Sequence, residues 1–257
     1  MTVKEMTIIL PCAGEGNRLG LKTPKELFEI FPGNGSPGTR LMDFSLRHIR
    51  AFPYKEKITV AVVIRSWKRE VAAYAAGQLP GIRVKTVMFN DDYREWPGSV
   101  YSAKEVFSKN NLVLLPDSFL GLSADAKDLR VTDSTGRTLV ELMSDALSVH
   151  KAVFGCVECS NRDLLKNLGA VKVEGGIVTA FQDKPVDSLD RFNGFWGCYG
   201  FRKEYGESLY HFLIHSVQHL SVSLREQPFY PPGALALGAY YDLGTWENIS
   251  RFKKMAS

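Results

Sequence analysis

Short apolar segments of strand length alternate with longer periodic segments along the first half of the chain. The apolar segments lie at residues 6–10, 58–64, 82–89 and 111–116. The periodic segments, in which apolar residues recur every three or four positions, lie at residues 41–52, 67–77 and 99–108. Strands that are apolar throughout are typical of a parallel sheet that helices cover on both faces. We therefore expect the first half to be a doubly wound, Rossmann-like α/β unit.

The second half has a different pattern. It predicts a helix near residues 138–149, a β-hairpin over residues 169–181 with two glycines at its turn, a strand at residues 196–201 and a helix at residues 206–220. A loop and a final helix end the chain, and neither repeats nor a low-complexity linker separate the halves. The sequence therefore predicts a single α/β domain over residues 1–257, built on a mixed, mostly parallel sheet.

Composition and charge narrow the class of protein. The 257 residues suffice for one large domain whose core needs neither disulfides nor metals. The formal net charge is only +4, and the 32 basic and 28 acidic side chains are interspersed. A nucleic-acid-binding protein would show a basic stripe, so we expect no nucleic-acid partner. A mild positive excess suits an anionic small molecule.

The sequence also predicts a cytoplasmic location. The first eight residues lack the layout of a signal peptide, and no window of about 18 apolar residues indicates a membrane span, so we expect no membrane partner. The four cysteines are Cys12, Cys156, Cys159 and Cys198. They are too few and too scattered for a disulfide framework or a zinc site, and we expect free thiols.

The loop after the first strand is the strongest candidate for a ligand site. Residues 9–28, ILPCAGEGNRLGLKTPKELF, combine three glycines with Arg18 and Lys25. In an open α/β sheet the ligand lies beyond the carboxyl ends of the strands, where free backbone N–H groups can bind phosphate oxygens. The loop is neither a dinucleotide fingerprint, which needs glycine where Leu19 stands, nor a Walker A loop. Two cations beside such a loop would neutralise phosphate charge, although a turn with solvated cations has the same pattern.

Five sequence blocks together resemble the sugar-phosphate nucleotidyltransferases, or NDP-sugar pyrophosphorylases. The first block is the glycine loop just described. The others are LLPDSFLG, LGAVKVEGGIVTAFQDKP, FNGFWGCYGF and YYDLGTWENI, at residues 114–121, 168–185, 192–201 and 240–249. They occur in the family's order and are distributed from residue 9 to residue 249, along most of the chain. The resemblance implies the nucleotide-diphospho-sugar transferase fold, with a nucleotide-binding half at about residues 1–120 and a sugar-phosphate-binding half at about residues 121–257.

The implied reaction transfers a nucleotidyl group from an NTP to a sugar 1-phosphate and releases pyrophosphate. The resemblance implies catalytic roles for Arg18, Lys25 and Asp117, with Arg18 on the leaving β- and γ-phosphates and Lys25 near the α-phosphate. Asp117 and Asp242 would hold Mg²⁺, which proteins bind through one or two carboxylates plus substrate phosphates. Capping of a helix or turn is the alternative role for each aspartate. The other residues implied to bind the nucleotide are Ala13, Gly14, Gly16, Pro97, Gly98 and Ser99.

The sugar phosphate would bind in the second half. Asp183 and Lys184 stand where the family has Glu-Lys-Pro, so Lys184 would bind the sugar-side phosphate and Asp183 a sugar hydroxyl. Asp is one methylene shorter than Glu, which leaves the hydroxyl contact open. Gly169, Asn193 and Gly194 would line the same pocket.

The sequence does not identify the base of the NTP. Residues 94–103, REWPGSVYSA, resemble the helix start P-x-G-x-A of the family, which approaches the base. Relatives that read uracil or thymine carry a glutamine several residues before its glycine, whereas this chain has Tyr93, Arg94 and Glu95. This departure favours CTP and GTP without excluding UTP and dTTP. The sequence names neither the sugar nor an oligomer interface, although homo-oligomers are common in the family.

Two other functions are compatible with parts of the sequence. Asn90, Asp91 and Asp92 follow a predicted strand and resemble the acidic metal site of glycosyltransferases of the same fold, which consume an NDP-sugar. A nucleotide-sensing protein without catalysis is the other alternative. It would be expected to lose Lys25 or Asp117, and the chain has both.

Overall fold

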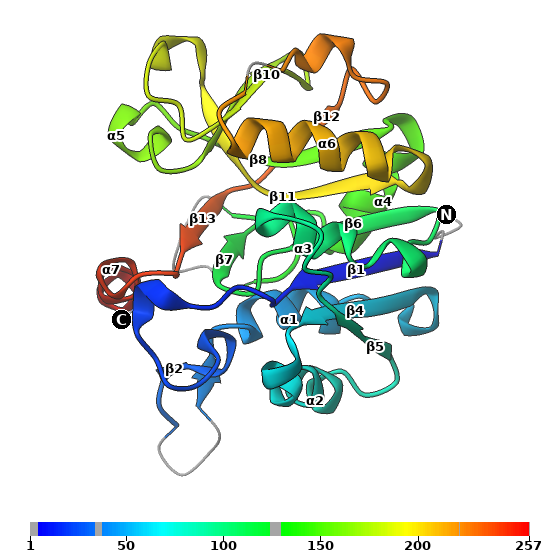
Figure 1. The fold of residues 1–257 in the computed structure, drawn as a ribbon, viewed down its shortest axis with the longest axis vertical. Coiled ribbons are helices and arrows are strands. Elements are labelled where there is room, and N and C mark those ends of the chain that lie inside the picture. Colours follow the sequence, from blue (N-terminus) through cyan, green and yellow to red (C-terminus); the bar gives the residue numbers. More distant parts are fainter. Residues whose placement is uncertain (1–4, 34–37, 124–129, 221, 257) are drawn as a thin grey trace.

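The computed structural model describes residues 5–33, 38–123, 130–220 and 222–256 of the chain. Its centre is a nine-stranded mixed sheet with the strand order β5-β4-β1-β6-β11-β8-β12-β10-β9 (Figure 1). The sheet runs without a break from the N-terminal half to the C-terminal half of the chain. This architecture agrees with the predicted single-domain α/β fold.

Four parallel strands carry the first half of the sheet. They are β1 (Met6–Pro11), β4 (Ile58–Ile64), β5 (Arg83–Met88) and β6 (Asn110–Leu114), in the order β5-β4-β1-β6. β1, β4 and β6 are buried almost throughout, which explains why their sequences are apolar runs and not alternating patterns.

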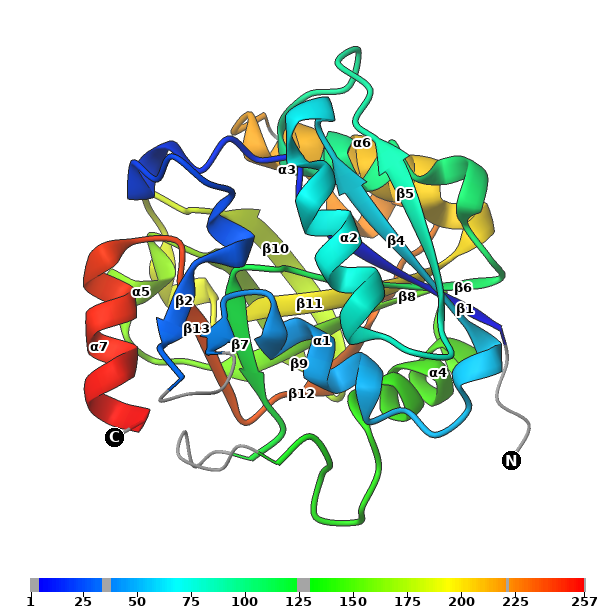
Figure 2. The ribbon, with the colours of Figure 1, turned by 90° about the horizontal axis from the view of Figure 1, so that it is seen from below.

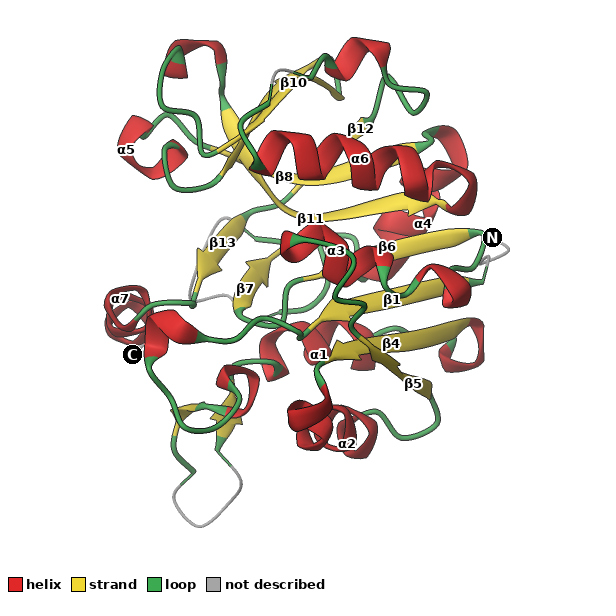
Figure 3. Ribbon diagram, in the orientation of Figure 1, coloured by secondary structure: helices red, strands yellow, loops and turns green. Residues whose placement is uncertain are grey.

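Helices cover the two faces of this sheet, as Figure 3 shows. One face packs against α1 (Asp43–Arg50), α2 (Arg69–Gln78) and α4 (Leu139–Val149). The other face packs against α3 (Glu95–Tyr101) and α6 (Gly206–Val217). Successive residues of β1 belong alternately to these two apolar clusters, as the two-residue period of a strand requires. The four parallel strands thus lie between two helical layers, to which the second half of the chain contributes α4 and α6.

The predicted helix at residues 99–108 is wrong at both ends. α3 begins four residues earlier, at Glu95, and a separate 3₁₀ turn, η5 (Lys104–Val106), follows it. Pro97 fits within the first turn of α3 because the first N–H groups of a helix have no partner inside the helix.

The second half departs from the prediction of a mostly parallel sheet. Its strands are β8 (Ala152–Glu158), β9 (Gly169–Glu174), β10 (Ile177–Asp183), β11 (Gly194–Arg202) and β12 (Gly233–Ala236). Within the described ranges, β8 and β12 form the one parallel pair of this half, and the other pairs are antiparallel. β9 pairs with both β10 and β11, so the five strands close into a ring. Irregularities in β10 and β11 bend these strands and permit the closure.

A small antiparallel ladder lies beside the end of β6. It consists of β7 (Ser118–Gly121) and β13 (Ala239–Asp242). α7 (Trp246–Ala256) packs near it through an apolar cluster that includes Phe119 and Phe252. Figure 2 shows the C-terminal segment, β13 and α7, next to β7 and the N-terminal loops. The ladder therefore brings the end of the chain to the carboxyl edge of the central sheet.

The remaining elements are short connections. They are β2 (Glu29–Phe31), β3 (Thr39–Arg40), α5 (Arg162–Leu165) and the 3₁₀ turns η1 (Asn17–Leu19), η2 (Lys25–Leu27), η3 (Lys55–Lys57), η4 (Ser66–Lys68), η6 (Leu189–Arg191), η7 (Lys203–Tyr205) and η8 (Leu224–Glu226). No helix in the described part of the chain combines the length and the apolar character that crossing a bilayer requires. All four cysteines are free thiols, as predicted.

Candidate active site

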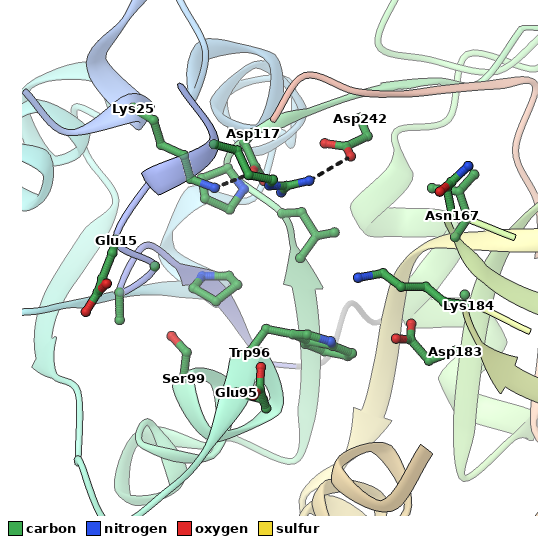
Figure 4. Close-up of a pocket in the computed structure, with 18 of the residues that line it drawn as sticks. Glu15, Lys25, Glu95, Trp96, Ser99, Asp117, Asn167, Asp183, Lys184 and Asp242 are labelled. Carbon is green, nitrogen blue, oxygen red and sulfur yellow. Dashed lines mark hydrogen bonds and ion pairs between the residues drawn. The ribbon is translucent and has the colours of Figure 1, made fainter. Parts of the chain in front are cut away.

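A cavity of about 400 Å³ opens at the carboxyl edge of the sheet. Its walls come from both halves of the chain: the loop after β1 and the start of α3 on one side, and the start of β9 and the end of β10 on the other (Figure 4). Ten of the predicted site residues line it, namely Ala13, Gly14, Arg18, Lys25, Ser99, Asp117, Gly169, Asp183, Lys184 and Asp242. Segments that are far apart in sequence thus meet in one place.

Lys25 and Asp117 form a close ion pair in this cavity. Lys25 Nζ donates to Asp117 Oδ2 at 2.5 Å, and the two side chains are 14% and 15% exposed. Burial opposes both charges, but the ion pair outweighs it. The pair raises the pKa of Lys25 and, together with Arg18, lowers the pKa of Asp117. Both groups are therefore charged at neutral pH.

Asp242 joins this pair through the ladder between β7 and β13. The residue after it, Leu243, donates its N–H to the Asp117 carbonyl oxygen at 2.9 Å. Burial, followed by the negative charge of Asp117, raises the pKa of Asp242. The Gly244 N–H donates to Asp242 Oδ1 at 2.8 Å, which is the turn-capping contact of the alternative role. The second carboxylate oxygen, Oδ2, lies 3.7 Å from Arg18 Nη1.

Two adjacent carboxylates are a donor set that a divalent cation fits. Mg²⁺ prefers oxygen ligands and commonly takes one or two carboxylates plus the phosphates of a substrate. In the described ranges, no group of three or more His, Cys, Asp and Glu side chains is placed to hold a metal. Asp117 and Asp242 could therefore hold Mg²⁺ when phosphate oxygens of a nucleotide complete its coordination.

The glycine loop bends closely around Lys25. Gly16 and Gly20 flank η1 with φ angles of +75° and +59°, which glycine adopts without strain. Gly16, predicted to bind the nucleotide, does not line the cavity. A Cβ at this position would lie 3.6 Å from Lys25 Cβ, so Gly16 packs against the lysine stem instead. Ala13 and Gly14 form the part of the loop that faces the cavity.

Asp183 and Lys184 lie on the opposite wall, at the end of β10. Asp183 is 7% exposed, and its pKa is raised by burial and by Glu95, against the opposing charges of Lys184 and His219. Lys184 has a φ angle of +42°, which is uncommon for a residue with a side chain, and its N–H donates to the Leu168 carbonyl at 3.0 Å. Figure 4 shows its ammonium directed into the cavity, with the Asp183 carboxylate beside it.

Gly169 and Trp196 shape the same wall. Gly169 lies opposite Asp183 in the β9–β10 ladder, and a Cβ on it would lie 1.9 Å from Trp196 Nε1, so no side chain fits there. This indole nitrogen is buried without a hydrogen-bond partner in the described part of the chain. Ser99 Oγ, on α3, is a second buried polar group without a partner among the described residues. Leaving such a group unpaired costs roughly 1–3 kcal/mol, and both residues belong to the cavity wall.

Asn193 and Gly194 do not line the cavity. The Asn193 side chain instead bonds the Val173 backbone twice: Oδ1 accepts from the N–H at 2.8 Å and Nδ2 donates to the carbonyl at 2.9 Å. A Cβ on Gly194 would lie 2.5 Å from the Val157 carbonyl oxygen. Both residues therefore join β8, β9 and β11, because the ring closure turns the start of β11 away from the cavity.

Pro97 and Gly98 also lie outside the cavity wall. Both are buried in the first turn of α3, and a Cβ on Gly98 would lie 2.8 Å from Tyr93 Cβ. Pro97 and Gly98 allow α3 to pack closely against its neighbours. Of the three predicted residues on α3, Ser99 is the one that lines the cavity.

Several residues that the sequence did not indicate complete the walls. Glu95 lines the cavity, and its backbone has a φ angle of +56°. Arg65 directly follows β4, the neighbour of β1, so the strand-end rule could have found it. The others are Glu15, Trp96, Asn167 and Tyr240. Glu15 lies in the glycine loop itself, whereas Trp96, Asn167 and Tyr240 come from segments that the tertiary fold brings to this edge.

Asn90, Asp91 and Asp92 do not line the cavity. Asp91 is 80% exposed and pairs with Arg65 Nη1 at 2.7 Å. The acidic segment that resembles a glycosyltransferase metal site is therefore separate from the carboxylates beside the glycine loop.

The structure has the fold of the sugar-phosphate nucleotidyltransferases. The apo structure of a UDP-glucose pyrophosphorylase superimposes with a TM-score of 0.71 at 14% identity, over 97% of each chain. A UDP-glucose pyrophosphorylase from Acinetobacter baumannii gives 0.69 at 15% identity, over 98% of this chain and 92% of that chain. The inositol-1-phosphate CTP transferase of T. maritima gives 0.64 at 14% identity, over 99% and 96%. By sequence, the chain matches no protein-family model and no curated protein.

Proposed function

We propose that the protein is a Mg²⁺-dependent nucleotidyltransferase that converts an NTP and a sugar 1-phosphate into an NDP-sugar and pyrophosphate. The observation that carries this proposal is the convergence of Lys25, Asp117, Asp242 and Lys184 in one cavity beside the glycine loop (Figure 4). The first three would bind a triphosphate with its cation, and Lys184 would hold a second phosphate on the opposite wall. Such a cavity suits the joining of two phosphate-bearing substrates.

The proposed reaction is an in-line displacement at the α-phosphorus of the NTP. A phosphate oxygen of the sugar phosphate forms the new bond, and the bond to pyrophosphate breaks on the opposite side. Lys184 would hold the attacking phosphate, Lys25 the α-phosphate, and Arg18 the leaving phosphates. Asp117 and Asp242 would hold Mg²⁺, which would supply positive charge for the phosphate oxygens. No covalent enzyme intermediate is required, so the side chains act by positioning and charge neutralisation.

The names of the structural neighbours support a sugar phosphate as the substrate that receives the nucleotidyl group. These neighbours are UDP-glucose pyrophosphorylases and an inositol-1-phosphate CTP transferase. The Asp183 carboxylate supplies a hydrogen-bond acceptor on the wall opposite the glycine loop, which suits a hydroxyl group. Ser99 and Glu95 line the nucleotide side, and neither identifies the base. We also propose that the protein is cytoplasmic and has neither nucleic-acid nor membrane partners, as its sequence predicts.

A glycosyltransferase of the same fold is the second candidate. It would require an acidic metal site next to an NDP-sugar, and Asp91 and Asp92 lie outside the cavity wall. Two of the carboxylates that do line the wall, those of Asp117 and Asp242, lie beside the loop suited to a triphosphate. A nucleotide sensor without catalysis would not need the Lys25–Asp117 pair.

The test is a thermal-shift panel with ATP, CTP, GTP, UTP and dTTP, each with Mg²⁺. A ligand at about 100 times its Kd adds about 2.7 kcal/mol to the free energy of unfolding, which gives a measurable rise in Tm. We expect one triphosphate to stabilise the protein more than the others, and that NTP then serves in a pyrophosphate-release screen over sugar phosphates. Stabilisation by NDP-sugars and by no NTP would favour the glycosyltransferase instead.

A further inference from the structure

Lys68 and Glu26 form a fully buried ion pair behind the glycine loop. Both side chains are 0% exposed, and Lys68 Nζ donates to the two carboxylate oxygens of Glu26 at 2.8 and 3.0 Å. Neither residue lines the cavity. Burying two charges carries a large desolvation penalty, and apolar residues of similar volume often give equal stability. Stability alone therefore does not explain this pair.

The Lys68 ammonium also binds the backbone of the loop. It donates to the carbonyl oxygens of Cys12 at 2.9 Å and Gly14 at 2.5 Å. Arg65 takes the carbonyl between them, because its Nε donates to Ala13 O at 3.1 Å. Lys68 and Arg65 both follow β4, which pairs with β1. Two cations from the neighbouring strand end thus bind three consecutive carbonyls of the loop.

Binding these carbonyls determines where the loop's N–H groups point. The peptides of the loop are trans, so each C=O and the N–H that follows it point in opposite directions. The N–H groups of Ala13 and Glu15 therefore point away from Lys68, and both residues line the cavity. Within the described ranges, neither N–H has a hydrogen-bond partner. They are donors available to an anion.

The same ion pair connects the loop to the turn that carries Lys25. Glu26 is the second residue of η2, directly after Lys25, and its carbonyl accepts the Met42 N–H at 3.1 Å. Lys68 thus holds the glycine loop and η2 at a constant separation, and with them the Lys25 ammonium that pairs with Asp117.

We propose that Lys68, together with Glu26 and Arg65, is a positioning residue that organises the glycine loop to bind a triphosphate before the ligand arrives. The identity of the anion rests on the proposed function. The Lys68 ammonium keeps carbonyl oxygens, which would repel phosphate, on the buried side of the loop and leaves N–H donors on the cavity side. Glu26 balances its charge and ties the loop to Lys25.

The variant that tests this role is Lys68→Met combined with Glu26→Leu. It removes both charges and keeps the volume, whereas Lys68→Met alone would leave Glu26 buried and unpaired and would destabilise the fold. A matched control is Lys172→Met combined with Glu174→Leu, which removes an exposed ion pair of 2.7 Å on β9, outside the cavity wall. Both double variants lose one positive and one negative charge. Thermal unfolding establishes that each is folded.

The first measurement needs no ligand and does not depend on the proposed function. Hydrogen–deuterium exchange, followed by mass spectrometry, is measured on peptides that cover residues 10–28. The variant Lys68→Met with Glu26→Leu is called the loop variant. We expect the bonded N–H groups of this segment, such as those of Cys12 and Leu19, to exchange at least about 10-fold faster in the loop variant. This factor is on the scale of losing a hydrogen bond to a charged group. The control should match the wild type. Unchanged exchange in the loop variant would overturn the proposal.

The second measurement is titration calorimetry with inorganic triphosphate and Mg²⁺. The loop variant should bind at least about 10-fold more weakly than the wild type, and, if catalysis is found, the KM for the sugar phosphate should not change. Equal affinity in the wild type and the variant would overturn the positioning role even if the loop is looser. If the wild type binds neither triphosphate nor any NTP, the proposed function fails and Lys68 loses its role toward a triphosphate.

Discussion

The surroundings of each charged side chain in the cavity determine the direction in which its pKa is shifted. Lys25 and Asp117 keep their charges despite burial because each is the partner of the other, whereas Asp242 and Asp183 carry raised pKa values because burial is not fully compensated. Groups with perturbed pKa values in a cavity are candidates for ligand binding. The sequence blocks that resemble the nucleotidyltransferases already indicated these residues, but only their spatial arrangement shows which are paired.

Removing either partner of the central ion pair should abolish most of the activity. We expect Lys25→Ala and Asp117→Asn each to lower turnover at least about 100-fold, because in the proposed reaction Lys25 neutralises transition-state charge and Asp117 holds the cation that does the same. Pyrophosphate release measures turnover, and circular dichroism verifies the fold. Lys22→Ala is the matched control, since Lys22 is exposed in the same loop and lines no cavity wall. Near-normal turnover of either site variant would refute its role.

The buried His48 should make the protein sensitive to moderate acid. Its Nε2 lies 3.1 Å from the Leu120 carbonyl oxygen, and burial together with the charge of Arg47 lowers its pKa to about 3. The unfolded chain, with a pKa of about 6.5, binds the proton more readily. Stability should therefore be complete above about pH 6.5 and fall as the pH decreases toward about 3, by up to about 1.4 kcal/mol per pH unit.

Urea unfolding at pH 7, 6 and 5 measures this slope. His48→Gln keeps a donor for the Leu120 carbonyl but cannot titrate, so its free energy of unfolding should depend less on pH over this range. His211→Gln, at an exposed position of α6, should retain the wild-type slope. Identical slopes in all three proteins would show that His48 does not determine the acid sensitivity.

At the scale of secondary structure, elements with a strong local signal were predicted well and those that depend on long-range pairing were not. β1, β4 and β6 are apolar runs in sequence because they are buried on both faces, and α4 begins with a capping box at Thr138. The start of α3 was missed because Pro97 and Gly98 resemble a helix boundary. The ring of β8 to β12 was missed because its closure depends on pairing between β9 and β11, for which no local pattern exists.

The turn after β13 should control the metal-binding geometry. A Cβ on Gly244 would lie 2.7 Å from Arg18 Nη2 and 2.9 Å from Asp242 Oδ1. Arg18 is exposed and can move away, whereas the carboxylate is bonded to the Gly244 N–H. We therefore expect Gly244→Ala to raise the Mg²⁺ concentration for half-maximal activity about 10-fold, the scale of disturbing a residue that orients a metal ligand.

The control for this turn is Gly77→Ala. Gly77 lies in α2, where a Cβ would have no neighbour within 4 Å, and alanine there should leave activity unchanged and stabilise the helix slightly. A Gly244→Ala enzyme with the wild-type Mg²⁺ dependence would show that the turn does not position Asp242.

At the scale of the whole molecule, one continuous sheet joins the two predicted halves. β6 of the first half pairs with β11 of the second, and β7 pairs with β13 near the end of the chain. The cavity walls come from both sides of this junction. A ligand that bridges the walls should therefore stabilise the entire sheet.

Calorimetric unfolding should accordingly show a single transition. Addition of the preferred NTP with Mg²⁺ should move that whole transition to higher temperature, because binding to the folded state alone shifts the cooperative unit. Tryptophan fluorescence and far-ultraviolet circular dichroism should report the same midpoint. A second transition that the ligand leaves in place would show that the halves unfold independently.

The α/β class and the glycine loop with Arg18 and Lys25 could be predicted from the sequence, because buried strands and a glycine-rich loop leave short, local patterns. Asp117 and Asp242 were indicated by the resemblance of their sequence blocks to the nucleotidyltransferases. The tertiary structure alone decided which of these residues meet. It placed Asp242 beside Asp117 through the β7–β13 ladder, turned Asn193 and Gly194 away from the cavity, and buried Lys68 behind the loop. These outcomes follow from strand pairing and packing between distant segments, which no single segment encodes.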